Sequence, residues 1–347
     1  MKKFFLLLSI IILGYIPKAT AHTLYLATSA NRLASFDSSD PQTLLTDIAI
    51  TGILADEDIE GIDFRPSTGE LYALGLRTEG LSQEARLYTL DINSGVATLV
   101  GAGPFKSDFS DTADNFGFTF DPVSDLIRIT DTIEDNLSLD PDTAVPTTDT
   151  DLAYATGDTH EGDSPTVSSV AFTNSFPGAT ETTAYAIDGA LDILARLGGM
   201  DGTLPLPSSG QLFTVGDLIK NAAGTCSMDI ASDGTAYAFF SESGTPGLFL
   251  INLSTGEATP QPPPPNSNQI GDGMTGLEGI AVFEEFPPTP TPTATPLVTP
   301  SPSPAPGPAP IVSGGGCQLG ESFSPGMWSQ LFFGAWLSLV YFRIRRR

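Results

Sequence analysis

Five short, similar segments recur along this 347-residue chain at nearly even spacing, and they constrain its fold more than any other feature. Each segment begins with a tiny residue and places apolar residues at its second and fourth positions. Their first residues lie 56, 52, 58 and 52 positions apart. The segments are residues 61–64, 117–120, 169–172, 227–230 and 279–282. A repeat of about fifty residues made of short strands is typical of a β-propeller, with one blade per repeat.

The repeat that covers residues 61–101 shows the plan of a blade most clearly. Alternating apolar residues at 62–64 lead into a turn that contains Pro66 and Gly69, and strand patterns follow at 71–74, 86–90 and 96–100. Proline and glycine suit the backbone angles of such turns, while β-branched and aromatic residues suit a pleated surface. Four strands in about forty residues make one blade.

The two ends of the repeat region complement each other. The last repeat has only its first strand, at 277–283, whereas residues 23–50 contain three strand patterns with no first strand before them. We predict that these segments share one blade, because such a closure leaves few unpaired strand edges. The sequence therefore predicts an all-β, five-bladed propeller. Six blades remain an alternative, because residues 140–165 and 198–225 are poorly patterned.

The segments outside residues 22–285 have the features of targeting and anchoring sequences. Residues 1–21 have a charged start, an apolar core and small residues up to Ala21, which predicts a signal peptide cleaved after Ala21. Residues 286–312 are mostly Pro, Thr, Ser and Ala, a composition typical of an extended stalk. In residues 313–347, Cys317 follows three glycines and precedes an apolar segment and an arginine cluster. We expect that apolar segment to cross a membrane, with the propeller outside the cell.

The charge of the predicted propeller limits its partners. Residues 22–285 hold 40 Asp and Glu against 8 Lys and Arg, a formal charge of −32. This charge should repel nucleic acids and anionic lipid head groups, and it suits cationic partners or calcium. It can equally serve only to keep an exported protein soluble. We expect a monomer that binds an extracellular protein or a glycan.

Acidic residues are the only candidates for chemistry at the centre of the ring. The chain has two histidines, His22 and His160, too few for a three-histidine zinc site. Glu60 and Glu278 occupy the same place in their repeats, so we predict that both lie near one mouth of the central channel, with Asp63 and Asp229. Close carboxylates can bind a cation or raise each other's pKa. Alternatively, these residues cap strand ends and turns.

A second acidic group lies in the repeat that starts at residue 117. Asp131, Glu134 and Asp135 provide oxygen ligands of the kind that calcium accepts. A calcium-binding loop of known spacing does not occur there, so a solvated acidic loop is the alternative interpretation.

Residues 23–285 resemble a bacterial family called domain of unknown function 4394. The segments that carry the resemblance are 61–75, 86–91, 136–143 and 183–188. It implies a propeller-like exported protein and brings no established activity or catalytic residue. The tail resembles the three-part C-terminal sorting signals of Gram-negative bacteria, which implies removal of the apolar helix and anchoring through Cys317. An ordinary membrane anchor is the alternative.

Together these features favour a binding module displayed on the cell surface or outer membrane and carried on a proline-rich stalk. No catalytic constellation is evident, and calcium is the one cofactor that the acidic composition would suit. The alternative is an extracellular carbohydrate-active lyase or hydrolase that uses carboxylates at the channel mouth.

Overall fold

The computed structural model describes residues 21–285, apart from 80–81, 111–114, 243–244, 264 and 273, together with Gly307. The predicted signal peptide up to residue 20, nearly all of the stalk and the whole tail with Cys317 lie outside these residues. The described blades belong to one compact unit, Met1–Pro290. None of the described residues forms an α-helix, and accordingly no helix suited to crossing a membrane is found among them.

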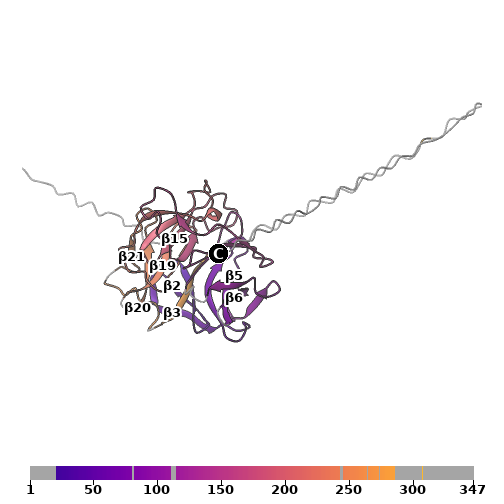
Figure 1. Ribbon diagram of the computed structural model, residues 1–347. Helices are drawn as coiled ribbons and strands as arrows, with labels where there is room; N and C mark the ends of the chain where they lie inside the picture. Colours follow the sequence, from indigo (N-terminus) through magenta and orange to yellow (C-terminus); the bar gives the residue numbers. More distant parts are fainter. Residues whose placement is uncertain are drawn as a thin grey trace, which may run out of the picture. The chain divides into compact units, whose positions relative to one another are not determined.

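Five small sheets are arranged as a five-bladed β-propeller, which confirms the predicted fold (Figure 1). Blade 1 contains β4 (Glu57–Phe64), β5 (Leu71–Glu79), β6 (Ser82–Leu90) and β7 (Ala97–Val100), with β8 (Lys106–Ser110) paired to β6. Blade 2 contains β9 (Phe116–Phe120), β10 (Ile127–Asp131), β11 (Asn136–Leu139) and β12 (Pro146–Thr148). Blade 3 contains β14 (Val167–Phe172), β15 (Ala184–Asp188), β16 (Ile193–Leu197) and β17 (Gln211–Asp217), with β13 (Ala153–Tyr154) parallel to β17.

The last two blades complete the ring. Blade 4 contains β18 (Ser227–Ile230), β19 (Ala236–Glu242), β20 (Thr245–Ile251) and β21 (Ala258–Pro260). Blade 5 contains β22 (Leu277–Phe283), β1 (Thr23–Thr28), β2 (Arg32–Asp37) and β3 (Asp40–Ala49). The poorly patterned stretches supply β12, β13, β17 and the short 3-10 helix η1 (Pro207–Ser209) and add no sixth blade.

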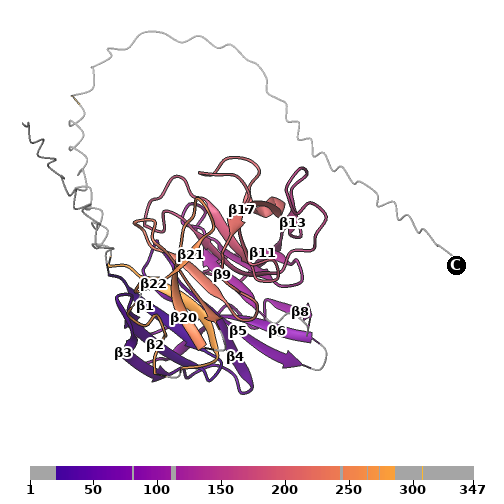
Figure 2. The same cartoon turned by 90° about the vertical axis from the view of Figure 1, so that its left-hand side faces the viewer.

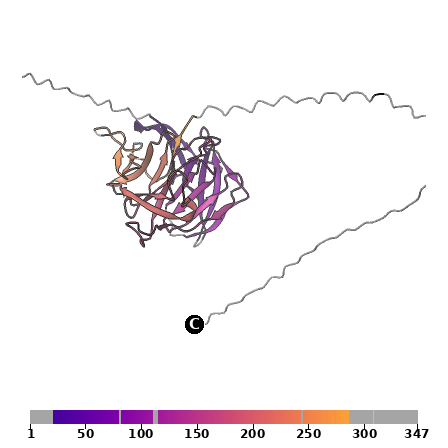
Figure 3. The ribbon, with the colours of Figure 1, turned by 90° about the horizontal axis from the view of Figure 1, so that it is seen from above.

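Blade 5 joins the two ends of the described chain, as predicted. Strand β22 pairs antiparallel with β1, from Thr23 opposite Phe283 to Ala27 opposite Gly279. Figures 2 and 3 show the orange end of the described chain beside its indigo beginning. The C-terminal segment is thus the inner strand of a sheet whose other strands come from the N-terminal segment.

The inner strands touch one another in the order β4, β9, β14, β18, β22 and back to β4. Their close approach explains the tiny first residue of each repeat. A Cβ atom on Gly61 would lie 2.6 Å from Cβ of Phe118, and one on Gly279 would lie 2.8 Å from the backbone nitrogen of Ile62. Neither position has room for a larger side chain.

The hydrophobic core is divided into clusters that lie mostly between neighbouring blades. Four of the five clusters combine side chains of two successive blades, for example Tyr72 of blade 1 with Phe118 of blade 2. Each blade therefore depends on its neighbours to cover its apolar faces, and an open ring would expose two of them.

Removing the closing strand tests this dependence. Deletion of Leu277–Phe283 removes Leu277, Ile280 and Val282, which are at most 4% exposed. Burial of three such side chains stabilises by roughly 5–9 kcal/mol, which matches the net stability of a typical domain, about 5–15 kcal/mol. We expect the deleted chain not to fold, as measured by circular dichroism and urea unfolding. A chain that stops after Pro290 is the control and should fold, and a cooperative unfolding transition of the deleted chain would contradict the shared blade.

Candidate functional site

Side chains on the inner strands tie each blade to the next around the axis. The Oγ atoms of Ser169 and Ser227 accept hydrogen bonds from the backbone N–H groups of Met228, at 2.7 Å, and Ile280, at 3.2 Å. The carboxylates of two further residues, Asp63 and Asp229, do the same two residues further along the strand, as described next. These contacts satisfy backbone donors that would otherwise be buried without a partner.

Asp63 and Asp229, two of the predicted ligand-binding residues, lie buried in this network. Asp63 Oδ2 accepts hydrogen bonds from the Phe120 N–H at 2.6 Å and the Thr119 hydroxyl at 3.0 Å. Asp229 Oδ2 accepts one from the Val282 N–H at 2.6 Å. The two side chains are 4% and 6% exposed, and burial raises the pKa of both. Their contacts assign them a structural role, as acceptors between blades.

Glu60 and Glu278 differ from the two aspartates because both lie at β-bulges. In β4, Ile59 pairs with Gly75 and Gly61 with Leu74, so Glu60 has no pairing partner. In β22, Gly279 pairs with Ala27 and Leu277 with Thr28, so Glu278 is the extra residue. A β-bulge re-aims the side chain that it carries and is common beside functional sites.

The two bulges lie close together, and the charge of Glu278 acts on Glu60. Each glutamate directly precedes the glycine of its repeat, and a Cβ atom on Gly279 would lie 3.1 Å from Cα of Gly61. Both side chains are half-buried, and the hydrogen bonds and ion pairs of the described residues involve neither carboxylate. Burial, with the negative charges of Glu278 and Asp58, raises the pKa of Glu60 to about 8, and burial and Asp58 raise that of Glu278 to about 7.

The equivalent positions of the other three repeats carry uncharged side chains. Phe116 and Ser168 are buried, and Ser168 also lies at a bulge of its strand. Its Oγ lies 2.9 Å from Sγ of Cys226, the equivalent residue of blade 4. Burial raises the pKa of the Cys226 thiol to about 12, so this cysteine is a poor nucleophile. The acidic character of this end of the ring therefore comes from blades 1 and 5.

The candidate calcium residues do not converge on a shared point. Asp131 is fully buried, and its Oδ1 accepts hydrogen bonds from the N–H groups of Ile133 and Asp135, while its Oδ2 has no partner among the described residues. Asp135 pairs with Lys106, and Glu134 lies in the left-handed region with φ of 80°. The described part of the chain contains no group of three His, Cys, Asp or Glu residues placed to hold a metal ion. Calcium binding stays a prediction.

The two histidines serve local packing. His22 Nδ1 lies 2.9 Å from the Tyr237 hydroxyl, and its backbone N–H donates to Ser38 Oγ. His160 Nδ1 lies 3.1 Å from Asp163 Oδ2, and its ring contacts that of Tyr154. Both rings are thus engaged by neighbouring side chains.

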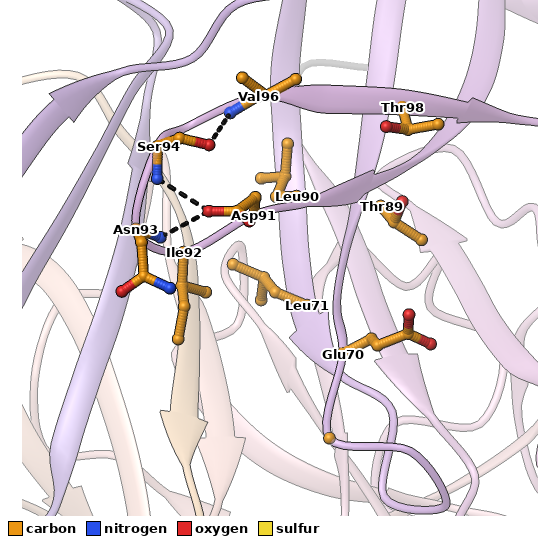
Figure 4. A pocket seen from close by; sticks show the side chains of 11 residues that line it. Glu70, Leu71, Thr89, Leu90, Asp91, Ile92, Asn93, Ser94, Val96 and Thr98 are labelled. Carbon is orange, nitrogen blue, oxygen red and sulfur yellow. Dashed lines mark hydrogen bonds between the residues drawn. The ribbon is translucent and has the colours of Figure 1, made fainter.

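Three of the cavities that the described residues line contain neither Glu60 nor Glu278. One of about 430 Å³ lies beside the outer strands of blade 1 (Figure 4). One of its two acidic side chains, Asp91, accepts hydrogen bonds from the N–H groups of Ser94 and Asn93, which lowers its pKa. This carboxylate stabilises its own turn. A second cavity, of about 460 Å³, is lined by Phe105, Lys106 and Asp135. The third lies between blades 2 and 3.

The sequence analysis overlooked the serine acceptors and the bulges. The serines were visible in the sequence, because serine replaces glycine at the first position of two repeats. There its hydroxyl accepts a hydrogen bond from a backbone N–H of the next blade. The bulges could not be found in the sequence, because they follow from the pairing register of the strands and not from residue type.

The raised pKa of Glu60 gives a testable pH dependence. The folded state holds this proton up to about pH 8, while an unfolded glutamate releases it near 4.5. The free energy of unfolding should therefore fall as the pH rises from about 4.5 to about 8. Glu60→Gln removes this loss and should be more stable than the unchanged protein at pH 8.5 by about 1–2 kcal/mol, a value discounted for partial exposure. The two should be nearly equal at pH 4.5. Urea unfolding at several pH values across this range measures the difference. If the free energy of unfolding of both proteins changed with pH in the same way, the raised pKa of Glu60 would be contradicted. Glu70→Gln, in an exposed turn, is the control.

Several solved structures are similar to this protein in fold. One chain of a nidogen–laminin complex matches with 10% identity and a TM-score of 0.42, over 76% of this chain and 99% of that one. A protein of unknown function from Bacteroides caccae matches with 9% identity and a TM-score of 0.38, over 77% and 100%. An α-L-arabinanase from Penicillium chrysogenum, complexed with arabinobiose, matches with 12% identity and a TM-score of 0.38, over 67% and 73%. These weak likenesses carry no functional argument.

No curated protein matches the chain in sequence. A family model does match, over residues 32–272, which include most of the described propeller. This agrees with the resemblance on segments 61–75, 86–91, 136–143 and 183–188. The chain belongs to the family described as Domain of unknown function (DUF4394).

Proposed function

We propose that this protein is an exported binding module on the cell surface, whose channel mouth binds a positively charged group of an extracellular protein or glycan. The observation that carries the proposal is the pair Glu60 and Glu278. Two half-buried carboxyl groups lie close together, with no hydrogen-bond donor or cation from the described residues to satisfy them. A cationic ligand would stabilise the ionised form of both groups, which burial and mutual repulsion otherwise disfavour.

The charge of the domain supports the same class of ligand. With a formal charge of −32 over residues 22–285, the surface attracts cations over a distance of about a Debye length, roughly 8–10 Å. A rigid ring of blades holds the two bulges in place, so the mouth is already formed before a ligand arrives. A basic side chain or an amino sugar has the required charge.

An extracellular carbohydrate-active enzyme is the second candidate function. The observation that favours it is the pKa of Glu60, near 8, beside that of Glu278, near 7. A carboxyl group that keeps its proton at neutral pH can act as a general acid toward a glycosidic oxygen. The two candidates differ in whether a glycan is merely held or is cleaved.

Paired glycan probes separate these outcomes. Chitosan oligosaccharides carry free amines, whereas chitin oligosaccharides of equal length carry neutral acetamides. We expect the purified chain to bind the chitosan probe at least about fivefold more tightly, roughly 1 kcal/mol. Glu60→Gln with Glu278→Gln should abolish the preference, while Glu70→Gln with Glu257→Gln, at exposed positions, should retain it. Equal binding of both probes would contradict a cationic ligand, and turnover of any polysaccharide that is lost in Glu60→Gln would establish the enzyme.

The surface location is proposed from the ends of the chain. The signal up to Ala21 directs export, and the residues from 286 onward form the stalk and the sorting-type tail with Cys317. If Cys317 is the anchoring point, Cys317→Ala should release the protein into the medium or leave a longer precursor. Fractionation and immunoblotting of cells measure this, with Cys226→Ala, within the propeller, as the cysteine control. Unchanged size together with unchanged anchoring would contradict the sorting signal.

A further inference from the structure

A cavity of about 520 Å³ lies between blades 2 and 3, away from the glutamate pair. Its walls include the β9–β10 turn of blade 2 and the loops 180–182 and 199–203 of blade 3. The β9–β10 and β14–β15 turns follow the inner strands, whereas Glu60 and Glu278 lie before the repeated segments. These walls therefore lie toward the other end of the ring. Its volume falls within the range of ligand pockets, roughly 300–1,000 Å³.

Hydrogen bonds between the two blades hold the walls in place. Asn136 Nδ2 donates to the backbone oxygen of Pro207 at 3.1 Å, and the Thr150 N–H donates to that of Ser208 at 3.1 Å. In the adjoining loop, the Asp201 N–H donates to Thr183 Oγ1 at 2.8 Å. The cavity is thus preformed, which lowers the entropic penalty of binding.

The cavity carries an excess of negative charge. Arg128 is paired with Asp149 at 2.5 Å, and their side chains are 8% and 10% exposed, so these two charges neutralise each other. Asp121, Glu181 and Asp201 also line the cavity. The ion pairs of the described residues include none of these three carboxylates. Asp121 Oδ1 accepts hydrogen bonds from the N–H groups of Val123 and Ser124, and Asp201 Oδ1 accepts one from the Thr183 hydroxyl. These hydrogen bonds supply no positive charge, so three carboxylates without an ion-pair partner around one recess favour a cation inside it.

Apolar side chains line the same recess. Val123 and Leu206 are each 47% exposed, and Leu126 lies beside them on the wall. Exposed aliphatic groups beside carboxylates suit a ligand that has both an alkyl stem and a charged head. Lysine and arginine side chains have this construction, since methylene stems pack on apolar surface while the head stays at a polar rim.

Other ligand classes fit less well. The excess negative charge repels phosphates and sugar acids. A metal ion lacks ligands, because the described residues contain no group of three placed to coordinate one. Aromatic side chains, which would stack on a neutral sugar, do not occur among the residues that line the cavity.

We propose that this cavity is a second binding site, which takes the side chain of a lysine or arginine from an exposed segment of a partner protein. The site does not depend on the channel mouth, because the two share no residue and lie at different ends of the ring. A partner could therefore be recognised here even if the glutamate pair binds nothing.

The probe is a blocked five-residue peptide with one central lysine between glycines, compared with the same peptide carrying norleucine. Norleucine keeps the alkyl stem and removes the charge. We expect the full chain in detergent to bind the lysine peptide at least about fivefold more tightly, measured by ligand-detected NMR titration. Glu181→Gln with Asp201→Asn should abolish this preference, and Val123→Lys, which places a cation of its own at the exposed turn, should weaken binding of the lysine peptide.

The control variant, Glu70→Gln with Glu257→Gln, removes the same charge outside the cavity and should retain the preference. Hydrogen exchange locates the probe, with protection expected at residues 199–208. Equal affinity for the two peptides would overturn the proposal, as would an equal loss in the control variant. Protection at residues 57–62 and 277–280 alone would also overturn it, because the probe would then occupy the channel mouth.

Discussion

The close approach of five inner strands around one axis is the constraint on which the rest of the structure depends. At Gly61 and Gly279 the neighbouring strand leaves no room even for a methyl group. Because the strands are so near, a side chain on one can reach the backbone of the next, and Ser169, Ser227, Asp63 and Asp229 all do so. The close contact between inner strands thus excludes larger side chains at the glycines and also allows the hydrogen bonds that hold the blades together.

This crowding also explains where chemistry can occur. Within the repeated segments, these serine and aspartate side chains already accept hydrogen bonds from the next blade, so they are not free to bind a ligand. Just before those segments, the bulges at Glu60 and Glu278 free one residue from each sheet and turn it toward its neighbour. The two glutamates therefore have carboxyl groups whose ionised forms the surrounding protein does not stabilise, although they are only one residue away from the crowded glycines.

Both proposed sites follow from one electrostatic imbalance. The propeller has few cations, and several of them are already paired: Arg65 with Asp125 and Asp142, Arg86 with Glu84 and Glu57, and Arg128 with Asp149. These pairs are built into the walls and interfaces of the blades. The carboxylates that remain without such a partner include Glu60 and Glu278 and three that line the cavity between blades 2 and 3. A ligand that supplies the missing positive charge is the simplest complement to either place.

The sequence alone predicted the closure of the ring and, with six as the alternative, its five blades, because these follow from a repeat whose period and residue sizes are visible in one dimension. The tertiary structure decided the difference between Glu60 and Asp63, which look alike in the repeat. Only the pairing register shows that one lies on a bulge and the other faces the Phe120 N–H. It also decided that the poorly patterned residues 198–210 form a wall against blade 2, since Asn136 and Pro207 are 71 positions apart and meet only in the folded ring. Contacts between distant segments set burial and charge compensation, and no local pattern of residues records them.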